Sequence, residues 1–413
     1  MRAYLSLLRT PSAAAFCAAG FLTRLGGAMS SMAMILMMTA IYGSYTLAGG
    51  LTAVNSIAWA AGSAFLGHLV DRFGQRLVVL PSVLVSSCLL LCVALLAWLG
   101  MPAWTLFIPT VLCGATSVSI PAAVIARWHH VTDTPEQFQT ALSLESTLDD
   151  ITRVAGPFLA TLLAFSISPV AGVVAVGCTS MVGATILHLQ RSSVPPVVPR
   201  EPTKQRAGGF LPAIPGVAPM VAIAAAIGVF IGAVGVSVVA ATDAWGAKDT
   251  SGTIMAMISL SSALAGLAYG ARRWSTPLAR RFVISLAALA VGAGLFVGAW
   301  TPLTLGACAF FAGIPLAPTF INTNALVQRL VPPRRLTEGM TWSGTSVGIG
   351  IALGSALAGM LIDEVGYRAG FGCAAGGAAV ALLIVLACVG VISRHARDDT
   401  PPEVSPELTE ELR

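Results

Sequence analysis

Charged side chains are scarce in this 413-residue chain: they make up 10% of its residues, and only Lys204 and Lys248 are lysines. A soluble domain typically carries about 25% charged residues, so 23 basic and 18 acidic side chains cannot cover a water-facing surface of this size. The net charge of +5 is scattered between long apolar runs, whereas nucleic-acid binding needs a dense basic face. The composition excludes a soluble enzyme and a nucleic-acid partner, and it favours a lipid bilayer as the surroundings.

Motifs for covalent chemistry and metal binding are also missing from the sequence. The eight cysteines contain no C-x-x-C pair, and neither H-E-x-x-H nor G-x-x-x-x-G-K-S/T occurs. We therefore expect no disulfide framework, no metal or other cofactor, no ATP motor and no enzymatic activity. The cysteines are interpreted as small buried apolar residues.

Long apolar runs, by contrast, fill most of the chain, in which 56% of the residues are hydrophobic. A helix that crosses a bilayer needs about 20 mostly apolar residues. Runs of this kind, bounded by charge, proline or turn residues, predict an all-α membrane protein. It has twelve transmembrane helices, at residues 13–39, 46–66, 78–99, 104–126, 140–165, 169–190, 216–242, 252–270, 282–299, 303–326, 339–361 and 370–393.

The longest interior connection, residues 191–215, is rich in proline and polar side chains and separates six predicted helices from six. Short motifs recur on both sides of it, such as Ile120-Pro121 in the fourth helix and Ile314-Pro315 in the tenth. Two related halves are typical of secondary transporters. We therefore expect two pseudo-symmetric six-helix bundles, at residues 1–190 and 216–394. A cytoplasmic linker at residues 191–215 joins them, and a disordered cytoplasmic tail follows at residues 395–413.

The basic residues predict the orientation of the chain in the membrane. With the N-terminus inside, the arginines and lysines outside the spans fall in cytoplasmic segments, except for Lys248 and Arg368. Two more, Arg24 and Arg153, lie within spans. Because positive residues concentrate in cytoplasmic loops, we expect a multi-pass protein of the cell membrane with both termini in the cytoplasm.

The most specific motif is Gly67-His-Leu-Val-Asp71-Arg72-Phe-Gly74-Gln-Arg76, in the loop after the second predicted helix. It matches the signature G-x-x-x-D-R/K-x-G-x-R/K. With the twelve spans and the central linker, the chain resembles the major facilitator superfamily (MFS), and in particular its bacterial drug and metabolite efflux members. The resemblance implies the MFS fold and alternating access around a midplane cavity, with a small-molecule substrate.

Each residue type in this loop motif has a physical role. Gly67 permits close approach of helices, and Gly74 permits a turn that a side chain would obstruct. Asp71 is placed to meet a positive helix N-terminus or an arginine, and in the family this acid is thought to latch the two halves when the inner gate is closed. Arg72 and Arg76 would bind acidic partners or lipid headgroups. Membrane topology alone would require the arginines only, so we expect a gating role.

Five charged residues remain within the predicted spans, where charge is costly and usually functional. Arg24 lies in the first span, and Glu145, Asp149, Asp150 and Arg153 lie in the fifth. At about 100° per residue, Glu145, Asp149 and Arg153 share one stripe of the helix. At about 1.5 Å per residue, Asp149 and Asp150 lie roughly 13–15 Å from the inner end of this helix, close to the midplane.

These five charges do not balance, because two arginines face three acids. Arg153 can pair with Asp149 or Asp150 along the helix, and Arg24 can neutralise another acid across helices. One carboxylate is left over, and in a low-dielectric setting it binds a proton more readily than in water. Glu145 and Asp149 are the candidates. A purely structural network, proton coupling and direct substrate contact remain as alternatives.

Several polar or flexible residues are candidates for the lining of a substrate cavity. Methionines in the outer half of the first span suit varied apolar ligands, although plain packing is the alternative. The tenth span carries more amides than lipid would accept, and these amides could instead hydrogen-bond between helices. The candidates are Met34, Asn55, Asn322, Asn324 and Trp342.

The first functional hypothesis is proton-linked export of small hydrophobic compounds by a monomeric transporter, with the proton gradient as its energy source. Gly156-Pro157 resembles part of the family's antiporter signature, although Thr152 replaces one of its glycines. The alternative is uptake or facilitated passage of a polar or anionic solute, which Arg24 and the amides of the tenth span would recognise. A remote alternative is a non-transporting membrane sensor.

Overall fold

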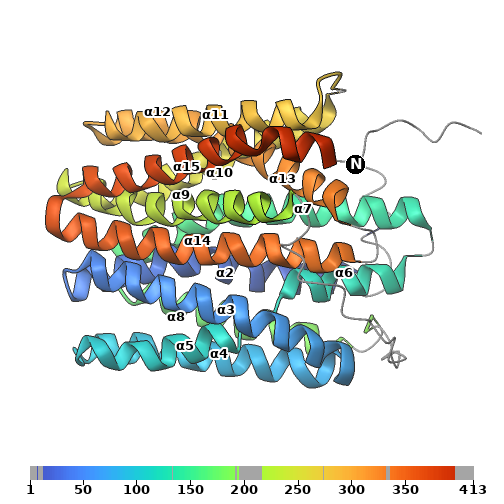
Figure 1. Ribbon diagram of the computed structural model, residues 1–413. Coiled ribbons are helices and arrows are strands. Elements are labelled where there is room, and N and C mark those ends of the chain that lie inside the picture. Colours follow the sequence, from blue (N-terminus) through green and yellow to red (C-terminus); the bar gives the residue numbers. More distant parts are fainter. Residues whose placement is uncertain are drawn as a thin grey trace, which may run out of the picture.

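The computed structural model describes residue 7 and residues 13–132, 134–190, 193–194, 216–272, 274–331 and 335–395. Within this part of the chain, every element is a helix, and most of the helices run side by side along one direction (Figure 1). The predicted linker and tail lie outside the described residues, except for residues 193, 194 and 395.

The N-terminal half contains seven α-helices and one short 3-10 helix. Their bounds are α2 Ala13–Ile41, α3 Tyr45–Phe73, α4 Gln75–Trp98, η1 Ala103–Leu106, α5 Phe107–Ala115, α6 Ile120–Val131, α7 Pro135–Ser166 and α8 Ala171–Leu189. The C-terminal half repeats the order of the α-helices, but its 3-10 helix comes after the first α-helix and not after the third. Its helices are α9 Val217–Ala244, η3 Lys248–Thr250, α10 Ser251–Ala271, α11 Leu278–Val297, α12 Pro302–Gly313, α13 Leu316–Leu330, α14 Leu336–Val365 and α15 Tyr367–His395.

These helices form twelve units long enough to cross a bilayer, as the sequence predicts. Eleven of them are also apolar enough by composition. The twelfth is α7, whose 32 residues include the five charged side chains of Glu136, Glu145, Asp149, Asp150 and Arg153. This helix begins at Pro135, five residues before the predicted start, because Thr134 caps it by accepting a hydrogen bond from the Gln137 amide (3.2 Å).

Two of the twelve units are broken in the middle, at the repeated Ile-Pro motifs. In the fourth unit, α5 ends at Ala115 and α6 begins at Ile120, with Pro121 in its first turn. In the tenth unit, α12 ends at Gly313 and α13 begins after Pro315. Proline cannot donate the backbone hydrogen bond of a helix interior, so both halves break at corresponding places.

The two halves lie against each other. In Figure 1 most of the blue and cyan helices lie on one side of α14, whereas α7 of the N-terminal half overlaps the helices of the C-terminal half on the other side. We call the end where α8 finishes and α9 starts the linker end, and the opposite end the far end. At the far end, α3 and α14 approach backbone to backbone. A Cβ built on Gly49 would lie 2.1 Å from the Ser355 carbonyl oxygen, and one on Gly359 would lie 2.4 Å from that of Tyr45. Only glycine allows such an approach.

The same pair of helices separates toward the linker end. A Cβ on Gly348 would lie 3.8 Å from the Ala60 side chain, and one on Gly67 would meet no described atom within 4 Å. The close helix approach predicted at Gly67 is therefore absent from this conformation. Helices α7 and α10 also meet toward the far end, where a Cβ on Gly252 would lie 2.4 Å from the Pro157 carbonyl oxygen. The halves are thus closed at the far end, and α3 and α14 are apart at the linker end.

The expectation that all the cysteines are buried is wrong for three of them. Cys88, Cys92 and Cys178 are exposed on the helix surface. Their positions in apolar runs do not distinguish core from lipid-facing surface, because lipid accepts a small apolar side chain as readily as the core does.

Candidate functional site

Arg24 is the centre of a buried charge network between α2 and α7. Its side chain is 5% exposed and binds two carboxylates of α7 at once, Glu145 through one terminal nitrogen and Asp149 through the other (2.9 Å). Its Nε donates to the Gly20 carbonyl oxygen (3.2 Å). The geometry supplies one guanidinium for two acids, so the network has one negative charge in excess if all three groups are ionised.

Glu145 is the more enclosed of the two acids. Its side chain is 5% exposed, and besides the Arg24 contact it accepts hydrogen bonds from Trp128 Nε1 (2.7 Å) and Cys17 Sγ (3.1 Å). Trp128 is completely buried and packs edge-on against Phe16, with ring centroids 4.7 Å apart. The donors hold the carboxylate in place. Cys17 lies in an apolar run and Trp128 lies between Arg127 and His129, and neither position signals a contact with Glu145.

Asp149 is held less completely than Glu145. Its side chain is 34% exposed, and Arg24 is the one partner of its carboxylate in the described part of the chain. Its neighbour Asp150 accepts from Arg153 (2.7 Å), and that arginine is 63% exposed. Of the two pairings open to Arg153, the structure therefore has the one with Asp150.

The two sides of the network meet because they lie at equal depth. Arg24 is 17 residues from the far end of α2, at Ile41, and Asp149 is 17 residues from the far end of α7, at Ser166. Both distances correspond to about 26 Å of helix. Asp149 is also 14 residues from the start of α7 at Pro135, about 21 Å of helix, so the network lies near the middle of this helix and slightly toward the linker end.

Asp150 and Arg153 lie on the face of α7 that points toward the C-terminal half. Asp150 precedes Pro157 and Thr161 by seven and eleven residues, which are close to whole numbers of helical turns. Pro157 and Thr161 contact α10 at Gly252. Nearer the linker end, this face carries the exposed Asp150–Arg153 pair. Asp149 lies between it and the buried Arg24.

The loop motif after α3 forms a tight turn, and its glycines behave differently from each other. Gly74 has φ 84° and donates its amide to the Val70 carbonyl oxygen (2.8 Å), as the turn predicted there requires. The Arg72 guanidinium lies over the Phe73 ring, 5.2 Å from its centroid. The Asp71 side chain lies outside the described residues, so the predicted latch stays a prediction.

A different acid joins the two halves at the far end. Asp363 of α14 accepts hydrogen bonds from Ser44 Oγ (3.0 Å) and from the amides of Tyr45 (3.0 Å) and Thr46 (2.8 Å), at the N-terminus of α3. A carboxylate is favoured at the positive end of a helix. The sequence analysis missed this contact. Two features of the sequence could have indicated it: an acid near the end of the eleventh span, Asp363, and a serine suited to cap the start of the second span, Ser44.

A second contact beside it involves Asp243 of α9. Its carboxylate accepts from the Tyr45 hydroxyl (2.6 Å) and from Lys248 Nζ (2.9 Å). Tyr45 therefore binds the C-terminal half through both its amide and its hydroxyl. Together, the acceptors Asp363 and Asp243 close the far end on α3.

Comparison with known proteins now decides the family. The family model described as Major Facilitator Superfamily matches residues 16–241 and 220–411. The chain belongs to the major facilitator superfamily. It is similar to the uncharacterized MFS-type transporter y4rN of Sinorhizobium fredii (strain NBRC 101917 / NGR234), with 24% identity over 98% of both chains. This MFS chain is a multi-pass membrane secondary transporter and not an enzyme.

Solved structures agree on the MFS fold. The crystal structure of the nucleoside transporter NupG has a TM-score of 0.71 and 15% identity, covering 92% of this chain and 99% of that one. A bacterial homologue of the iron transporter ferroportin, in an inward-facing state, has a TM-score of 0.68 and 16% identity, covering 94% and 98%. These likenesses support the expected fold alone.

The five residues proposed to line the substrate cavity of this MFS transporter come from four helices, α2, α3, α13 and α14, and differ in their exposure. Met34 is 6% exposed in the core, and Asn322 is fully buried, binding the Tyr269 hydroxyl (2.8 Å) and Ser285 (3.4 Å). Asn324, two residues further along α13, is exposed on a different face. Asn55 and Trp342 are half-buried, on α3 and α14. In this conformation, Met34 and Asn322 are packing residues.

Arg127, which was assigned to the cytoplasmic side of the fourth span, is 2% exposed. Its guanidinium donates to Gln75 Oε1 (3.0 Å), to the Leu187 carbonyl oxygen (2.9 Å) and to Ser193 Oγ (3.1 Å). Gln75 in turn donates to the Ala123 carbonyl oxygen (3.0 Å). This arginine therefore holds together the start of α4 and the ends of α6 and α8 at the linker end.

Proposed function

We propose that this transporter uses protons to drive the export of small hydrophobic compounds, and that Asp149 carries the proton. The observation behind the proposal is the sharing of one buried guanidinium, that of Arg24, by two carboxylates. An acid without a full partner in a low-dielectric setting binds a proton more readily than one in water. One proton on the Glu145–Asp149 pair neutralises the network.

Asp149 suits this role better than Glu145 because it is accessible. A proton carrier must exchange with water, and the side chain of Asp149 is 34% exposed whereas that of Glu145 is 5% exposed. Glu145 is also bound by Trp128 and Cys17 as hydrogen-bond donors, which keep it in place. We therefore assign the proton to Asp149, and Arg24 then stays with Glu145.

Protonation at Asp149 changes the contact between α2 and α7 next to their closest approach. A Cβ on Gly156 would lie 2.7 Å from Ala28, so the two backbones touch there, about two turns beyond Asp149. Releasing Asp149 from Arg24 frees the part of α7 nearer the linker end to tilt about this contact. Because α7 also contacts α10 at Gly252, the tilt changes the gap between the halves.

The side chains available to a substrate favour an apolar compound over an anionic solute. Arg24 and Asn322, which would recognise a polar or anionic solute, are buried and engaged with protein partners. The exposed pair on the gap face of α7, Asp150 and Arg153, carries no net charge. We also infer, from the basic residues, that the linker end faces the cytoplasm and that the transporter works as a monomer in the cell membrane.

Transport by the purified protein tests the proposal. The protein is reconstituted into liposomes with an imposed pH gradient, and a panel of fluorescent hydrophobic compounds and of anionic solutes is screened for gradient-driven movement. The wild type should accumulate a hydrophobic compound and move protons in the opposite direction. Asp149→Asn should lose at least 90% of the gradient-dependent flux, on the order expected for loss of an essential proton carrier.

Asp150→Asn is the matched control, because it removes a neighbouring carboxylate that already has its own arginine. It should keep the dependence of transport on the pH gradient. Undiminished gradient-driven accumulation in Asp149→Asn would refute the assignment of the proton. Movement of anionic solutes alone would refute the substrate class.

A further inference from the structure

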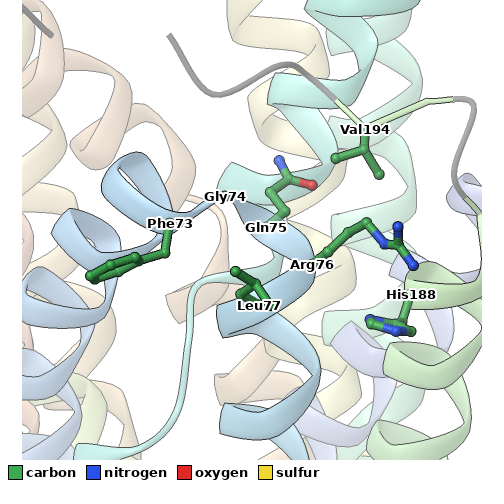
Figure 2. A pocket seen from close by; sticks show the side chains of 7 residues that line it. All are labelled: Phe73, Gly74, Gln75, Arg76, Leu77, His188 and Val194. Carbon is green, nitrogen blue, oxygen red and sulfur yellow. The ribbon is translucent and has the colours of Figure 1, made fainter. Parts of the chain in front are cut away.

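A cavity of about 420 Å³ opens at the linker end of the N-terminal half, away from the charge network. Figure 2 shows its walls, which come from the turn between α3 and α4, the end of α8 and the start of the linker. The lining residues are Phe73, Gly74, Gln75, Arg76, Leu77, His188 and Val194. None of these seven is acidic, and two of them carry basic side chains.

Arg76 and His188 point toward each other across this cavity (Figure 2). Arg76 Nε and His188 Nδ1 are both buried, and neither has a hydrogen-bond partner among the described residues. A buried polar nitrogen without a partner costs free energy. Two basic groups that face each other without an acid in the lining form a site for an anion.

The start of α4 adds further donors. Its N-cap residue is Gly74, which has no side chain to satisfy the first amides, and the helix continues for 24 residues. The first amides of a helix and its dipole attract phosphate groups. Gln75 cannot replace the missing cap, because its side chain is already bound to Arg127 and to the Ala123 carbonyl oxygen.

The mouth of the cavity is apolar and open. Leu77 is 71% exposed and Phe73 is 45% exposed, next to the basic groups. A free phosphate ion would gain nothing from these side chains, whereas a phospholipid would place its acyl chains against them. Arg127 holds the end of α8 and Ser193 at the back of the site.

We propose that this cavity binds the phosphate group of an anionic phospholipid, with Arg76, His188 and the first amides of α4 as donors. The phosphate bridges the turn after α3 to the end of α8. The phosphate thereby contacts Gly74 and Arg76 of the loop motif, which have no role in the proposed transport of protons. The lipid would stabilise the transporter with its linker end open, since the cavity is formed in that conformation.

Native mass spectrometry of the purified protein in detergent tests this site. The probes are dioleoylphosphatidylglycerol, the zwitterionic dioleoylphosphatidylcholine and inorganic phosphate. The wild type should retain one phosphatidylglycerol more tightly than phosphatidylcholine. Arg76→Gln should weaken this binding about tenfold, as expected for the loss of a charge-assisted hydrogen bond. His188→Gln should weaken it to a smaller extent, and Arg76→Lys should keep most of the preference for the anionic lipid.

Arg272→Gln is the control for a general loss of positive charge at the same end, since that guanidinium lies over Trp274, 4.9 Å from the ring centroid. It should bind phosphatidylglycerol as the wild type does. Equal affinity in the wild type and Arg76→Gln, both eluting as folded protein in gel filtration, would overturn the site, as would an equal loss in Arg272→Gln. If inorganic phosphate alone saturates the site and phosphatidylglycerol does not bind, the lipid is overturned as the source of the phosphate.

Discussion

At the scale of single residues, Arg24 is the side chain that most strongly constrains the molecule. A buried cation is tolerated only when hydrogen bonds and opposite charges replace the water that it has lost. Arg24 finds them in Glu145, Asp149 and the Gly20 carbonyl oxygen. This requirement fixes α2 against α7, and it leaves the two acids competing for a single partner.

Removing the enclosed acid should therefore cost stability. Glu145→Gln should lower the free energy of unfolding by about 3 kcal/mol, the size expected when one partner of a buried ion pair is lost. The amide would face the Arg24 guanidinium and would offer Trp128 a weaker acceptor. Thermal or denaturant unfolding in detergent measures this change.

The control for that substitution is Glu136→Gln in the exposed first turn of the same helix. An exposed site of this kind should change the free energy of unfolding by less than about 0.5 kcal/mol. Similar stability losses in the two variants would contradict the structural importance of the Arg24–Glu145 pair.

The residues of this network could be predicted only in part from the sequence. Charges inside apolar runs identified Arg24 and the acids, because lipid excludes charge unless it is used. Helical spacing allowed Arg153 to pair with either Asp149 or Asp150. In the structure Arg24, on another helix, binds Asp149, and Arg153 pairs with Asp150. Trp128 and Cys17 were missed because nothing in the sequence around either residue shows that it faces a carboxylate on another helix.

At the scale of helices, the contact of α14 with the start of α3 closes the far end. Asp363 satisfies two backbone amides and a hydroxyl at the positive end of α3, and Gly49 and Gly359 let the helices touch. Because Asp363 is exposed, solvent screening limits the contribution of a carboxylate at a helix N-terminus to about 0.3–1 kcal/mol. A single acid can therefore bias which end of the transporter is open.

Asp363→Asn should shift the population toward opening of the far end by about two- to fivefold, because the amide loses the charge that the helix end attracts. Spin labels at Ala40 and Glu364, exposed sites at the far ends of the two halves, would report the change by double electron–electron resonance. In a background without the native cysteines, a longer distance should gain population.

Asp249→Asn, which removes another acid at the far end, in η3, is the control for that measurement and should leave the distance distribution as it is. An unchanged distribution in Asp363→Asn would contradict the role of Asp363 in holding the far end closed.

Helix positions were more predictable than their contacts. Apolar runs gave all twelve spans, and the repeated Ile-Pro pairs mark the places where the fourth and tenth spans break. The early start of α7 was missed although Thr134 and Pro135 form a helix-start signal, because the polar first turns of this helix do not resemble a membrane span. Contacts between distant helices, such as that of Asp363 with α3, leave no periodic pattern in the sequence.

At the scale of the whole molecule, the two halves meet at the far end and part along α3 and α14 at the linker end. The loop motif predicts a latch that forms when the linker end is closed, whereas the structure has its close contacts at the other end. An alternating-access transporter closes one end at a time, so the prediction concerns a second conformation. In this conformation a Cβ on Gly67 would contact no described atom. The predicted latch by Asp71 belongs to the conformation in which the linker end is closed.

The division of the chain into bundles at 1–190 and 216–394 stays a prediction, but the symmetric breaks and the repeated helix order favour it. In this arrangement, the charge network belongs to the N-terminal half and sits beside the gap. A proton bound there can act on α7, the helix that also contacts the other half. This position is why we regard Asp149 as the centre of the mechanism.

Infrared difference spectroscopy of the purified protein tests that claim most directly, because it needs no substrate. Acidification of the wild type should produce a carbonyl stretching band of a protonated carboxylic acid. The account predicts that this band is absent from Asp149→Asn and present in Asp150→Asn. A band of equal intensity in the wild type and Asp149→Asn would contradict Asp149 as the proton carrier.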